Sequence, residues 1–248
     1  MDRWVGKVAL VTGASVGIGN SISQKLAEHG MKVVACARNK QQLDELAAAV
    51  NGKGEIFPYQ CDVKDEKQII GMFDFIRNKF GTIYVCVNNA GLGHQAQILS
   101  GNTEEWREMF DVNVIGLCIG CRESVKLMRE SGVDDGHVIN INSMSGHRVV
   151  KLSLYAATKF AVTALSEGLR KELKEAKTHI RCTSISPGRV ETQFVPRLNK
   201  DTSGEKDYYS FMKCLEADDI ADAVLFTLQA PSHVNVNEIM IRPTEQSF

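Results

Sequence analysis

Short apolar runs alternate along the chain with longer stretches in which apolar residues recur every three or four positions. The short runs have the length of strands, and the longer stretches have the periodicity of helices. Strands are predicted at Lys7–Thr12, Lys32–Ala37, Glu55–Gln60, Tyr84–Val87, Gly136–Asn142, Ile180–Ser186 and Glu238–Ile241. Helices are predicted at Gly17–His29, Gln41–Asn51, Lys64–Phe80, Glu104–Glu130, Tyr155–Ala176 and Asp218–Gln229.

The early strands indicate the type of sheet. Val8–Val11 and Val33–Ala35 are continuous apolar runs that do not alternate with polar residues. Strands of this kind are buried on both faces, which is typical of parallel sheets. Right-handed crossovers place helices on both faces of such a sheet. We therefore expect residues 1–248 to form a single α/β domain, a doubly wound parallel sheet of the Rossmann type.

The composition is that of an ordinary soluble globular protein, with 44% hydrophobic and 24% charged residues. Lys and Arg number 29 against 30 for Asp and Glu, which gives a formal net charge of −1. Nucleic-acid-binding proteins usually carry a clear basic excess, so no nucleic-acid partner is expected. The sequence has no secretory signal pattern and no apolar stretch near about 18 residues, so we expect a cytoplasmic protein without a membrane span.

The seven cysteines are scattered and odd in number, which favours a reducing compartment over a disulfide framework. Only Cys118 and Cys121 form a C-x-x-C pair, and they lie in Val112–Met128, which has the pattern of a long helix. A zinc site would require two further ligands at similar spacing, and the sequence has no second pair. The two thiols are interpreted as ordinary helix residues, and no metal site is predicted.

A glycine-rich turn, Thr12–Gly19, follows the first predicted strand and precedes the first predicted helix. Its glycines, Gly13, Gly17 and Gly19, have the spacing G-x-x-x-G-x-G. Glycines allow a tight turn and a close approach of backbone N–H groups to a phosphate, and the helix N-terminus adds a positive dipole end. The position of this turn predicts a dinucleotide site rather than a purely structural turn.

The end of the second predicted strand bears on which dinucleotide binds. Sites that prefer NAD usually place an acidic residue there to hold the ribose hydroxyls. This chain has Arg38 at that position and no acidic neighbour. A guanidinium pairs with a 2′-phosphate through charge-assisted hydrogen bonds. The sequence therefore favours NADP(H) over NAD(H), unless Arg38 is only a solvated surface residue.

A second cluster carries candidate acid–base chemistry. Tyr155 and Lys159 are four residues apart on a predicted helix, so their side chains lie on the same face. A neighbouring cation favours the phenolate and lowers the tyrosine pKa, which suits general acid–base catalysis. Ser143 follows the predicted strand ending at Asn142, where the carboxyl ends of parallel strands line a ligand crevice. Its hydroxyl is a candidate to hold the substrate oxygen.

Taken together, these motifs resemble those of the short-chain dehydrogenase/reductase family, in the family's order and spacing. The matching motifs are Thr12–Gly19, Asn88–Gly91, Asn113, Ser143, Tyr155, Lys159 and Ser186–Gly188. Within the family, the segments Asp134–Arg148 and Arg242–Gln246 most resemble the vertebrate eleventh-member group of the dehydrogenase/reductase branch and the related insect farnesol dehydrogenases. The resemblance implies an NADP-dependent oxidoreductase that interconverts an alcohol and a carbonyl compound.

The resemblance also implies a catalytic set of four residues. Tyr155 is expected to donate or accept the proton, and Lys159 to lower its pKa and bind the nicotinamide ribose. Ser143 is expected to orient the substrate carbonyl or alcohol. Asn113 is expected to hold a water that links Lys159 to solvent.

The implied cofactor contacts come from every motif. Asn89 is expected to support the cofactor, Asp62 to contact the adenine, and the segment after Gly188 to bind the carboxamide. The full expected set is Gly13, Ser15, Val16, Gly17, Ile18, Gly19, Arg38, Asn39, Asp62, Val63, Asn89, Ala90, Gly91, Tyr155, Lys159, Pro187, Gly188, Val190 and Thr192.

One cofactor position departs from the family pattern. Many NADP-dependent relatives carry a second basic residue just before the middle glycine of the turn, where this chain has Val16. Recognition of a 2′-phosphate is therefore expected to depend on Arg38. Either Ser15 or Asn39 would assist it.

The substrate side is expected to be mostly apolar. Ser145, His147 and Phe194 are the principal candidates for substrate contacts, although His147 has the alternative of a hydrogen bond within its loop. Further candidates are Leu92, His94, Leu198, Tyr208, Tyr209, Phe211 and Met212. The irregular segment Arg197–Lys213 is either a lid over the site or a plain surface loop.

An apolar site with few polar anchors fits a lipophilic alcohol or ketone. A farnesol-type isoprenoid alcohol is favoured, and reduction of a ketosteroid or dicarbonyl is the alternative. A protein that senses NADP(H) without turnover is a remoter alternative, because the same fold supports different functions. By the resemblance, the long helices Glu104–Glu130 and Tyr155–Ala176 are expected to pair across a two-fold axis in a homodimer or homotetramer.

Overall fold

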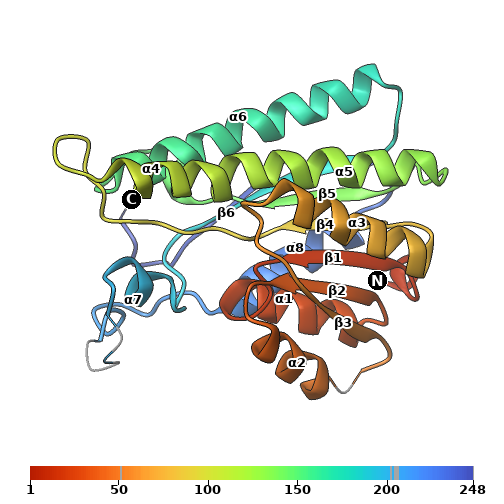
Figure 1. The fold of residues 1–248 in the computed structure, drawn as a ribbon, viewed down its shortest axis with the longest axis horizontal. Coiled ribbons are helices and arrows are strands. Elements are labelled where there is room, and N and C mark those ends of the chain that lie inside the picture. Colours follow the sequence, from red (N-terminus) through yellow and green to blue (C-terminus); the bar gives the residue numbers. More distant parts are fainter. Residues whose placement is uncertain (51, 202, 204–206, 248) are drawn as a thin grey trace.

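The computed structural model describes residues 1–50, 52–201, 203 and 207–247. Its strands form one parallel sheet in the order β3-β2-β1-β4-β5-β6-β7 (Figure 1). The strands are β1 (Val8–Thr12), β2 (Lys32–Ala37), β3 (Glu55–Gln60), β4 (Val85–Asn88), β5 (His137–Ile141), β6 (Arg181–Pro187) and β7 (Glu238–Ile241). The predicted doubly wound parallel sheet is confirmed.

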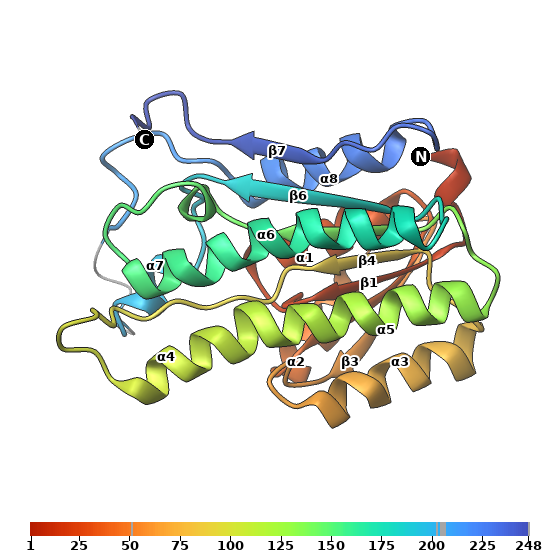
Figure 2. The same ribbon diagram turned by 90° about the horizontal axis from the view of Figure 1, so that it is seen from above.

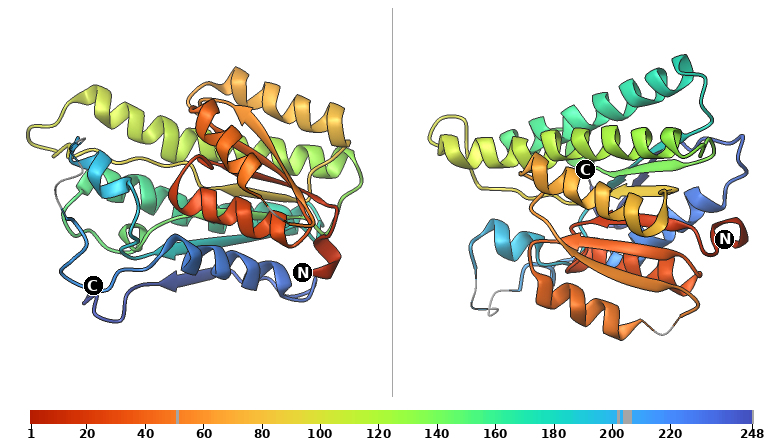
Figure 3. Two further views of the ribbon diagram at one scale, coloured as in Figure 1. Left: turned by 90° about the horizontal axis from the view of Figure 1, so that it is seen from below. Right: turned by 45° about the vertical axis from the view of Figure 1, so that its right-hand side comes forward.

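Helices cover both faces of this sheet. They are α1 (Gly17–Glu28), α2 (Lys40–Ala49), α3 (Glu66–Phe80), α4 (Thr103–Phe110), α5 (Leu117–Glu130), α6 (Ser153–Glu175), α7 (Phe194–Leu198) and α8 (Ala217–Gln229). Helices α3, α5 and α6 lie on one face (Figure 2), and α1, α2 and α8 lie on the other (Figure 3). No helix among the described residues is both long and apolar enough to cross a membrane.

The side chains of the continuous apolar strands pack into two hydrophobic cores, one on each face of the sheet. In β1, Ala9 and Val11 pack with the α1, α2 and α8 side chains, whereas Val8 and Leu10 pack with those of α3 and α5. Successive side chains of a strand point to opposite faces, so each strand that is buried on both sides contributes to both layers. This explains why the early strands show no alternation of apolar and polar residues.

The strand order changes direction between β1 and β4, and this change positions the site. β1 pairs with both β2 and β4, and the chain crosses from β3 at one edge back to β4 in the middle of the sheet. In open α/β sheets, ligands bind in the crevice outside the carboxyl ends of the strands at such a switch point. The glycine-rich turn after β1 and the Asn89–Gly91 turn after β4 therefore meet at one crevice.

Most predicted elements differ from the observed ones by one or two residues at an end. The prediction of one helix over Glu104–Glu130 was incomplete, because a π-helix (η2, Asp111–Gly116) separates α4 from α5. Helix α7 and the 3₁₀ turn η3 (Met144–Gly146) were not predicted. Residue 51 of the predicted second helix lies outside the described residues, as do 202 and 204–206 of the predicted lid loop.

Candidate active site

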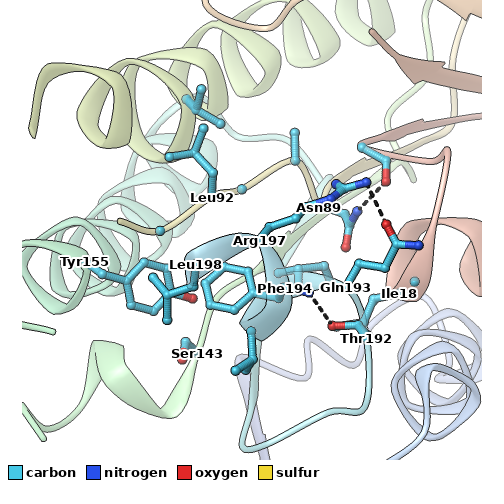
Figure 4. Close-up of a pocket in the computed structure, with 18 of the residues that line it drawn as sticks. Ile18, Asn89, Leu92, Ser143, Tyr155, Thr192, Gln193, Phe194, Arg197 and Leu198 are labelled. Carbon is cyan, nitrogen blue, oxygen red and sulfur yellow. Dashed lines mark hydrogen bonds between the residues drawn. The ribbon is translucent and has the colours of Figure 1, made fainter. Parts of the chain in front are cut away.

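A cavity of about 1150 Å³ lies along the carboxyl edge of the sheet. Its walls come from the segments that follow β1, β2, β3, β4, β5 and β6, together with α7. Figure 4 shows Tyr155 and Ser143 on one side of this cavity and Ile18 and Asn89 toward the other. The cavity therefore joins the glycine-rich turn to the acid–base cluster predicted from the sequence.

The glycine-rich turn has no space for side chains at its glycines. Gly13 has a φ of +67°, and a Cβ there would lie 2.9 Å from the Cα of Ala90. A Cβ at Gly19 would lie 2.4 Å from the carbonyl oxygen of Gly13. Gly13, but not Gly19, is among the described residues that line the cavity, so Gly19 serves close packing of α1 under the turn.

Asn89 fastens the turn after β4 to the turn after β1. Its side-chain Nδ2 donates to the carbonyl oxygens of Thr12 at 2.9 Å and Gly13 at 3.2 Å. The backbone N–H groups of Asn89 and Ala90 both donate to the Thr12 hydroxyl at 3.0 Å. Asn89 thus supports the crevice through the protein itself, which is consistent with the supporting role expected of it.

Arg38 lies exposed on the cavity wall at the carboxyl end of β2. Among the described residues its guanidinium has no hydrogen-bond acceptor and no carboxylate within 4 Å, so it is available to a ligand. The Asn39 side chain accepts a hydrogen bond from Gln42 N at 3.2 Å and thereby caps α2. Asp62 and Val63 line the same end of the cavity.

The catalytic candidates converge on the other half of the cavity. Tyr155 and Lys159 lie on one face of α6, and Ser143 follows β5; all three line the cavity. The Nζ of Lys159 donates to the carbonyl oxygen of Ile141 at 3.0 Å and lies 5.8 Å from the centroid of the Tyr155 ring. The ring of Phe194, from α7, lies 5.3 Å from the Tyr155 ring.

Burial dominates the protonation of this pair. It raises the pKa of Tyr155 to about 12, and the nearby Ser143 hydroxyl offsets this only in part. Burial also lowers the pKa of Lys159 to about 8. The pKa of Tyr155 is thus shifted in the direction opposite to that expected from a neighbouring cation, because burial is the largest cause.

Asn113 lies behind the cavity wall rather than on it. It is 1% exposed, in the π-helix η2. Its Nδ2 donates to Leu92 O at 2.8 Å and to the Thr158 hydroxyl at 3.0 Å, and its Oδ1 accepts from Leu92 N at 2.9 Å. The side chain therefore joins the loop after β4 to the catalytic helix α6, a role that was not predicted from the sequence.

Some of the predicted substrate residues line the cavity, and others do not. Leu92, His94, Ser145, Phe194 and Leu198 line the cavity. The described residues that do so include none of His147, Tyr208, Tyr209, Phe211 and Met212.

His147 instead joins two strands. Its Nε2 lies 2.9 Å from the Ser186 hydroxyl and 3.1 Å from a carboxylate oxygen of Glu238. His147 is not among the described residues that line the cavity, and these partners lie on β6 and β7 rather than within its own loop, so neither expected role matches its position. Tyr209 likewise serves the loop, since its hydroxyl donates to Thr192 O at 2.6 Å.

Several lining residues were missed by sequence reasoning. Val150 and Leu152 enter the wall from the loop before α6, and Gln193, Val195 and Arg197 enter from α7 and the residue before it. A five-residue helix within an irregular segment leaves no periodic pattern to find.

Comparison with known proteins places these features in context. A family model described as short chain dehydrogenase matches residues 7–203. Dehydrogenase/reductase SDR family member 11 of Gallus gallus is 51% identical over 253 residues, which cover 99% of each chain. The farnesol dehydrogenase of Aedes aegypti is 40% identical over 254 residues and covers both chains completely.

Solved structures resemble the chain along nearly its whole length. A serine dehydrogenase in a closed form with NADP⁺ superimposes with a TM-score of 0.89 at 32% identity, covering 97% of this chain and 96% of the other. An alcohol dehydrogenase from Thermococcus sibiricus, in complex with 5-hydroxy-NADP, has a TM-score of 0.85 at 28% identity and covers 97% of each chain.

Proposed function

This chain belongs to the short-chain dehydrogenase/reductase family, and on that premise we propose that it is an NADP(H)-dependent oxidoreductase. It interconverts a lipophilic alcohol and its aldehyde or ketone. The observation that carries the proposal is the convergence of Ser143, Tyr155 and Lys159 on the cavity that begins at the glycine-rich turn. Hydride and proton donors for one carbonyl group must meet at such a place.

The half of the cavity that is lined by the glycine-rich turn and Arg38 suits NADP(H). Gly13 and Gly17 line the cavity at the start of α1, where a helix N-terminus favours an anion such as a pyrophosphate. Arg38, without a carboxylate partner among the described residues, would hold the 2′-phosphate, and Asp62 and Val63 would border the adenine. Relatives of the same fold are known in complex with NADP⁺ and 5-hydroxy-NADP, which supports this assignment.

The remaining contacts follow the expected set. Ser15, Val16, Ile18 and Asn39 line the phosphate-binding half of the cavity, as does Gly17. Nearer the catalytic residues, Pro187, Gly188, Val190 and Thr192 form the wall that would face the nicotinamide, together with Ala90 and Gly91.

NADP(H), when bound, supplies or accepts the hydride, and the protein supplies orientation and the proton. Ser143 holds the substrate oxygen beside Tyr155. In reduction, the Tyr155 hydroxyl gives its proton to that oxygen as the alcohol forms, and in oxidation it takes the proton back. Its raised pKa keeps Tyr155 protonated at neutral pH, the form that reduction requires.

The substrate half of the cavity supports a lipophilic substrate. Leu92, Leu152, Phe194 and Leu198 line it and offer apolar contacts to a substrate, while polar residues of the same wall include His94, Ser145 and Arg148. We favour a farnesol-type isoprenoid alcohol, because the farnesol dehydrogenase of Aedes aegypti is similar over its entire length. Reduction of a ketosteroid or dicarbonyl is the second candidate, since the same walls accept a flat apolar ketone.

A direct test compares initial rates for farnesol with NADP⁺ against rates for ketosteroids and diketones with NADPH. Faster turnover of farnesol supports the isoprenoid assignment. Faster reduction of the ketones favours the second candidate. Binding of NADPH without turnover across a broad carbonyl panel would instead indicate a sensor.

Replacement of Tyr155 by Phe tests the chemistry. The variant keeps the ring that packs on Phe194 and loses only the hydroxyl. We expect turnover to fall by about 10²–10⁴-fold, the range for loss of a general acid–base group. NADPH affinity, measured by fluorescence titration, should change little. Full turnover by Tyr155→Phe would refute the assigned mechanism.

A further inference from the structure

The strap Thr192–Leu198, which contains α7, spans the cavity from one functional end to the other. At one end Thr192 packs against the start of α1, where a Cβ on Gly17 would lie 3.2 Å from the Thr192 methyl group. At the other end Phe194 packs on the Tyr155 ring at 5.3 Å. The strap therefore contacts both the expected phosphate-binding turn and the catalytic residues.

Arg197 of this strap is a cation on the cavity wall that forms no ion pair among the described residues. It lines the cavity and is exposed to solvent. Its Nη2 donates to the neutral Oε1 of Gln193 at 2.9 Å, one helical turn away. Within the described parts of the chain, no carboxylate lies within 4 Å of its guanidinium. The hydrogen bond to Gln193 orients the guanidinium but leaves its charge uncompensated.

The Arg197 side chain points away from the substrate half of the cavity. Figure 4 shows Arg197 and Gln193 on the side of Asn89 and Ile18, whereas Leu198 and Phe194 of the same strap face Tyr155. Ile18 belongs to the first turn of α1, whose N–H groups and positive dipole end favour an anion. An anion held there would lie between α1 on one side and the strap on the other.

We propose that Arg197 binds the pyrophosphate of the dinucleotide from the strap, opposite the glycine-rich turn. This inference rests on the proposed NADP(H)-dependent function. A guanidinium is suited to the role, because its planar fork donates to two phosphate oxygens at once and remains charged at every physiological pH. The bound cofactor would then hold the strap in the position seen here, with Phe194 against Tyr155.

This role differs from that of Arg38 in a measurable way. Arg38 is expected to recognise the 2′-phosphate, which only NADP(H) carries. The pyrophosphate is common to NADPH, NADH and ADP-ribose, and 2′-AMP lacks it. Loss of the Arg197 charge should therefore weaken the first three ligands equally and spare 2′-AMP.

The test uses Arg197→Met in the full chain, with dissociation constants from calorimetry. We expect each constant for NADPH, NADH and ADP-ribose to rise by about tenfold or more, the scale of a lost guanidinium–phosphate contact at an exposed site. The constant for 2′-AMP should stay within about twofold of the wild-type value. Because Arg197 is exposed, the variant should fold normally, and an unchanged melting temperature would confirm that.

Two further variants sharpen the result. Arg197→Lys keeps the charge without the fork and should recover part of the NADH affinity. Arg148→Met removes another exposed cation of the same cavity, near the substrate half, and should leave all four constants unchanged.

Three results would overturn the inference. Unchanged NADH and ADP-ribose binding in Arg197→Met would remove Arg197 from the cofactor site. Equal weakening of 2′-AMP would indicate a general disturbance of the cavity. Wild-type protein that binds neither NADPH nor NADH would refute the proposed function itself, and the inference with it.

Discussion

Burial controls the charge of Lys159, the residue that shares a face of α6 with Tyr155. The side chain is 4% exposed, and its partner is the neutral carbonyl of Ile141 rather than a carboxylate. Desolvation therefore lowers the Lys159 pKa from its ordinary 10.5 to about 8. A charge held this way costs folding free energy, and the proposed catalytic role of the ammonium beside the tyrosine would account for keeping it.

The sign of the effect on stability follows from linkage. Below about pH 8 the lysine is charged in both the folded and unfolded states, and its burial penalty is fully present. From about pH 8 to 10.5 the folded state releases the proton first, so stability due to this group rises with pH. We expect Lys159→Met to be about 2 kcal/mol more stable than wild type near neutral pH, with the gain shrinking toward about pH 10.

Urea unfolding of both proteins without added cofactor, at about pH 7 and about pH 10, measures this difference. Lys171→Met is the matched control, since the Lys171 side chain is 70% exposed and should affect stability little at either pH. A gain in unfolding free energy for Lys159→Met that is the same at both pH values would contradict the assigned burial penalty.

Arg38 is the residue that we propose to select NADP(H) over NAD(H). It is exposed on the cavity wall, and the described residues offer it no carboxylate partner. In Arg38→Asp we expect the dissociation constant for NADPH to rise on the order of 10–100-fold, because the 2′-phosphate loses its partner and meets a like charge. Affinity for NADH should hold or improve, as the new carboxylate can accept from the ribose hydroxyls. An unchanged preference for NADPH would exclude Arg38 as the determinant.

The catalytic helix α6 is joined to the turn that carries Ser143 by a small polar clamp. Asn142 Nδ2 donates to the Thr163 hydroxyl at 2.9 Å, and that hydroxyl donates to Gly146 O at 3.0 Å. Gly146 is packed so closely that a Cβ would lie 2.7 Å from Lys159 O. The clamp therefore sets how close η3 and α6 approach, and with it the position of Ser143 relative to Tyr155.

Two glycine-to-alanine variants test this packing. In Gly146→Ala the new methyl must push η3 away from α6, and we expect a loss of about 1–3 kcal/mol in unfolding free energy. Turnover should fall by more than tenfold, because small displacements of a catalytic group are costly. In Gly168→Ala, on α6, the added Cβ has no neighbouring atom within 4 Å. This variant should gain about 0.5–1 kcal/mol in unfolding free energy.

Chemical unfolding and steady-state rates on both variants give the comparison. Equal effects of the two substitutions would show that the contact between η3 and α6 is not decisive.

Elements with a long periodic pattern could be predicted, and those shaped by tertiary contacts could not. The strands β2, β3 and β7 have the predicted bounds, since their apolar runs end at clear polar signals. The π-helix η2 was not predicted, and its residue Asn113 bonds to Leu92, 21 residues away, a contact that no local pattern shows. Helix α7 was missed because five residues show no period.

On the whole molecule, the outer surface of α4, η2, α5 and α6 is the candidate interface between copies of the chain. These helices lie on one side of the sheet (Figures 1 and 2). Phe110, Ile115 and Phe160 on them are 38%, 52% and 43% exposed. Exposed apolar side chains on adjacent helices commonly mark a contact with another protein, and closed symmetry is the usual arrangement.

We expect light scattering to give the mass of a dimer or tetramer. Replacing both Ile115 and Phe160 by Glu should shift the protein toward the monomer, because burying the two carboxylates is costly. Ile70→Glu places the same charge on α3, where Ile70 is 37% exposed, and should leave the mass unchanged. A wild-type mass of one chain would contradict the proposed assembly.

The order of apolar and polar residues along the chain was enough to predict the layered sheet, the crevice and the residue types that carry the proposed chemistry. Apolar periodicity is a local property, and it defines strands, helices and their order. The spacing of Gly13, Ser143, Tyr155 and Lys159 also belongs to the sequence, and so does the presence of Arg38.

Which of these side chains lie close together, and whether each is protonated, depends on the tertiary packing around them. Desolvation depends on everything packed around a side chain, so the raised pKa of Tyr155 and the lowered pKa of Lys159 follow from the assembled cavity. The same holds for His147, whose partners Ser186 and Glu238 come from other strands, and for Arg197, carried to the glycine-rich turn by a strap from β6. Such contacts join residues far apart in the chain, and no local pattern records them.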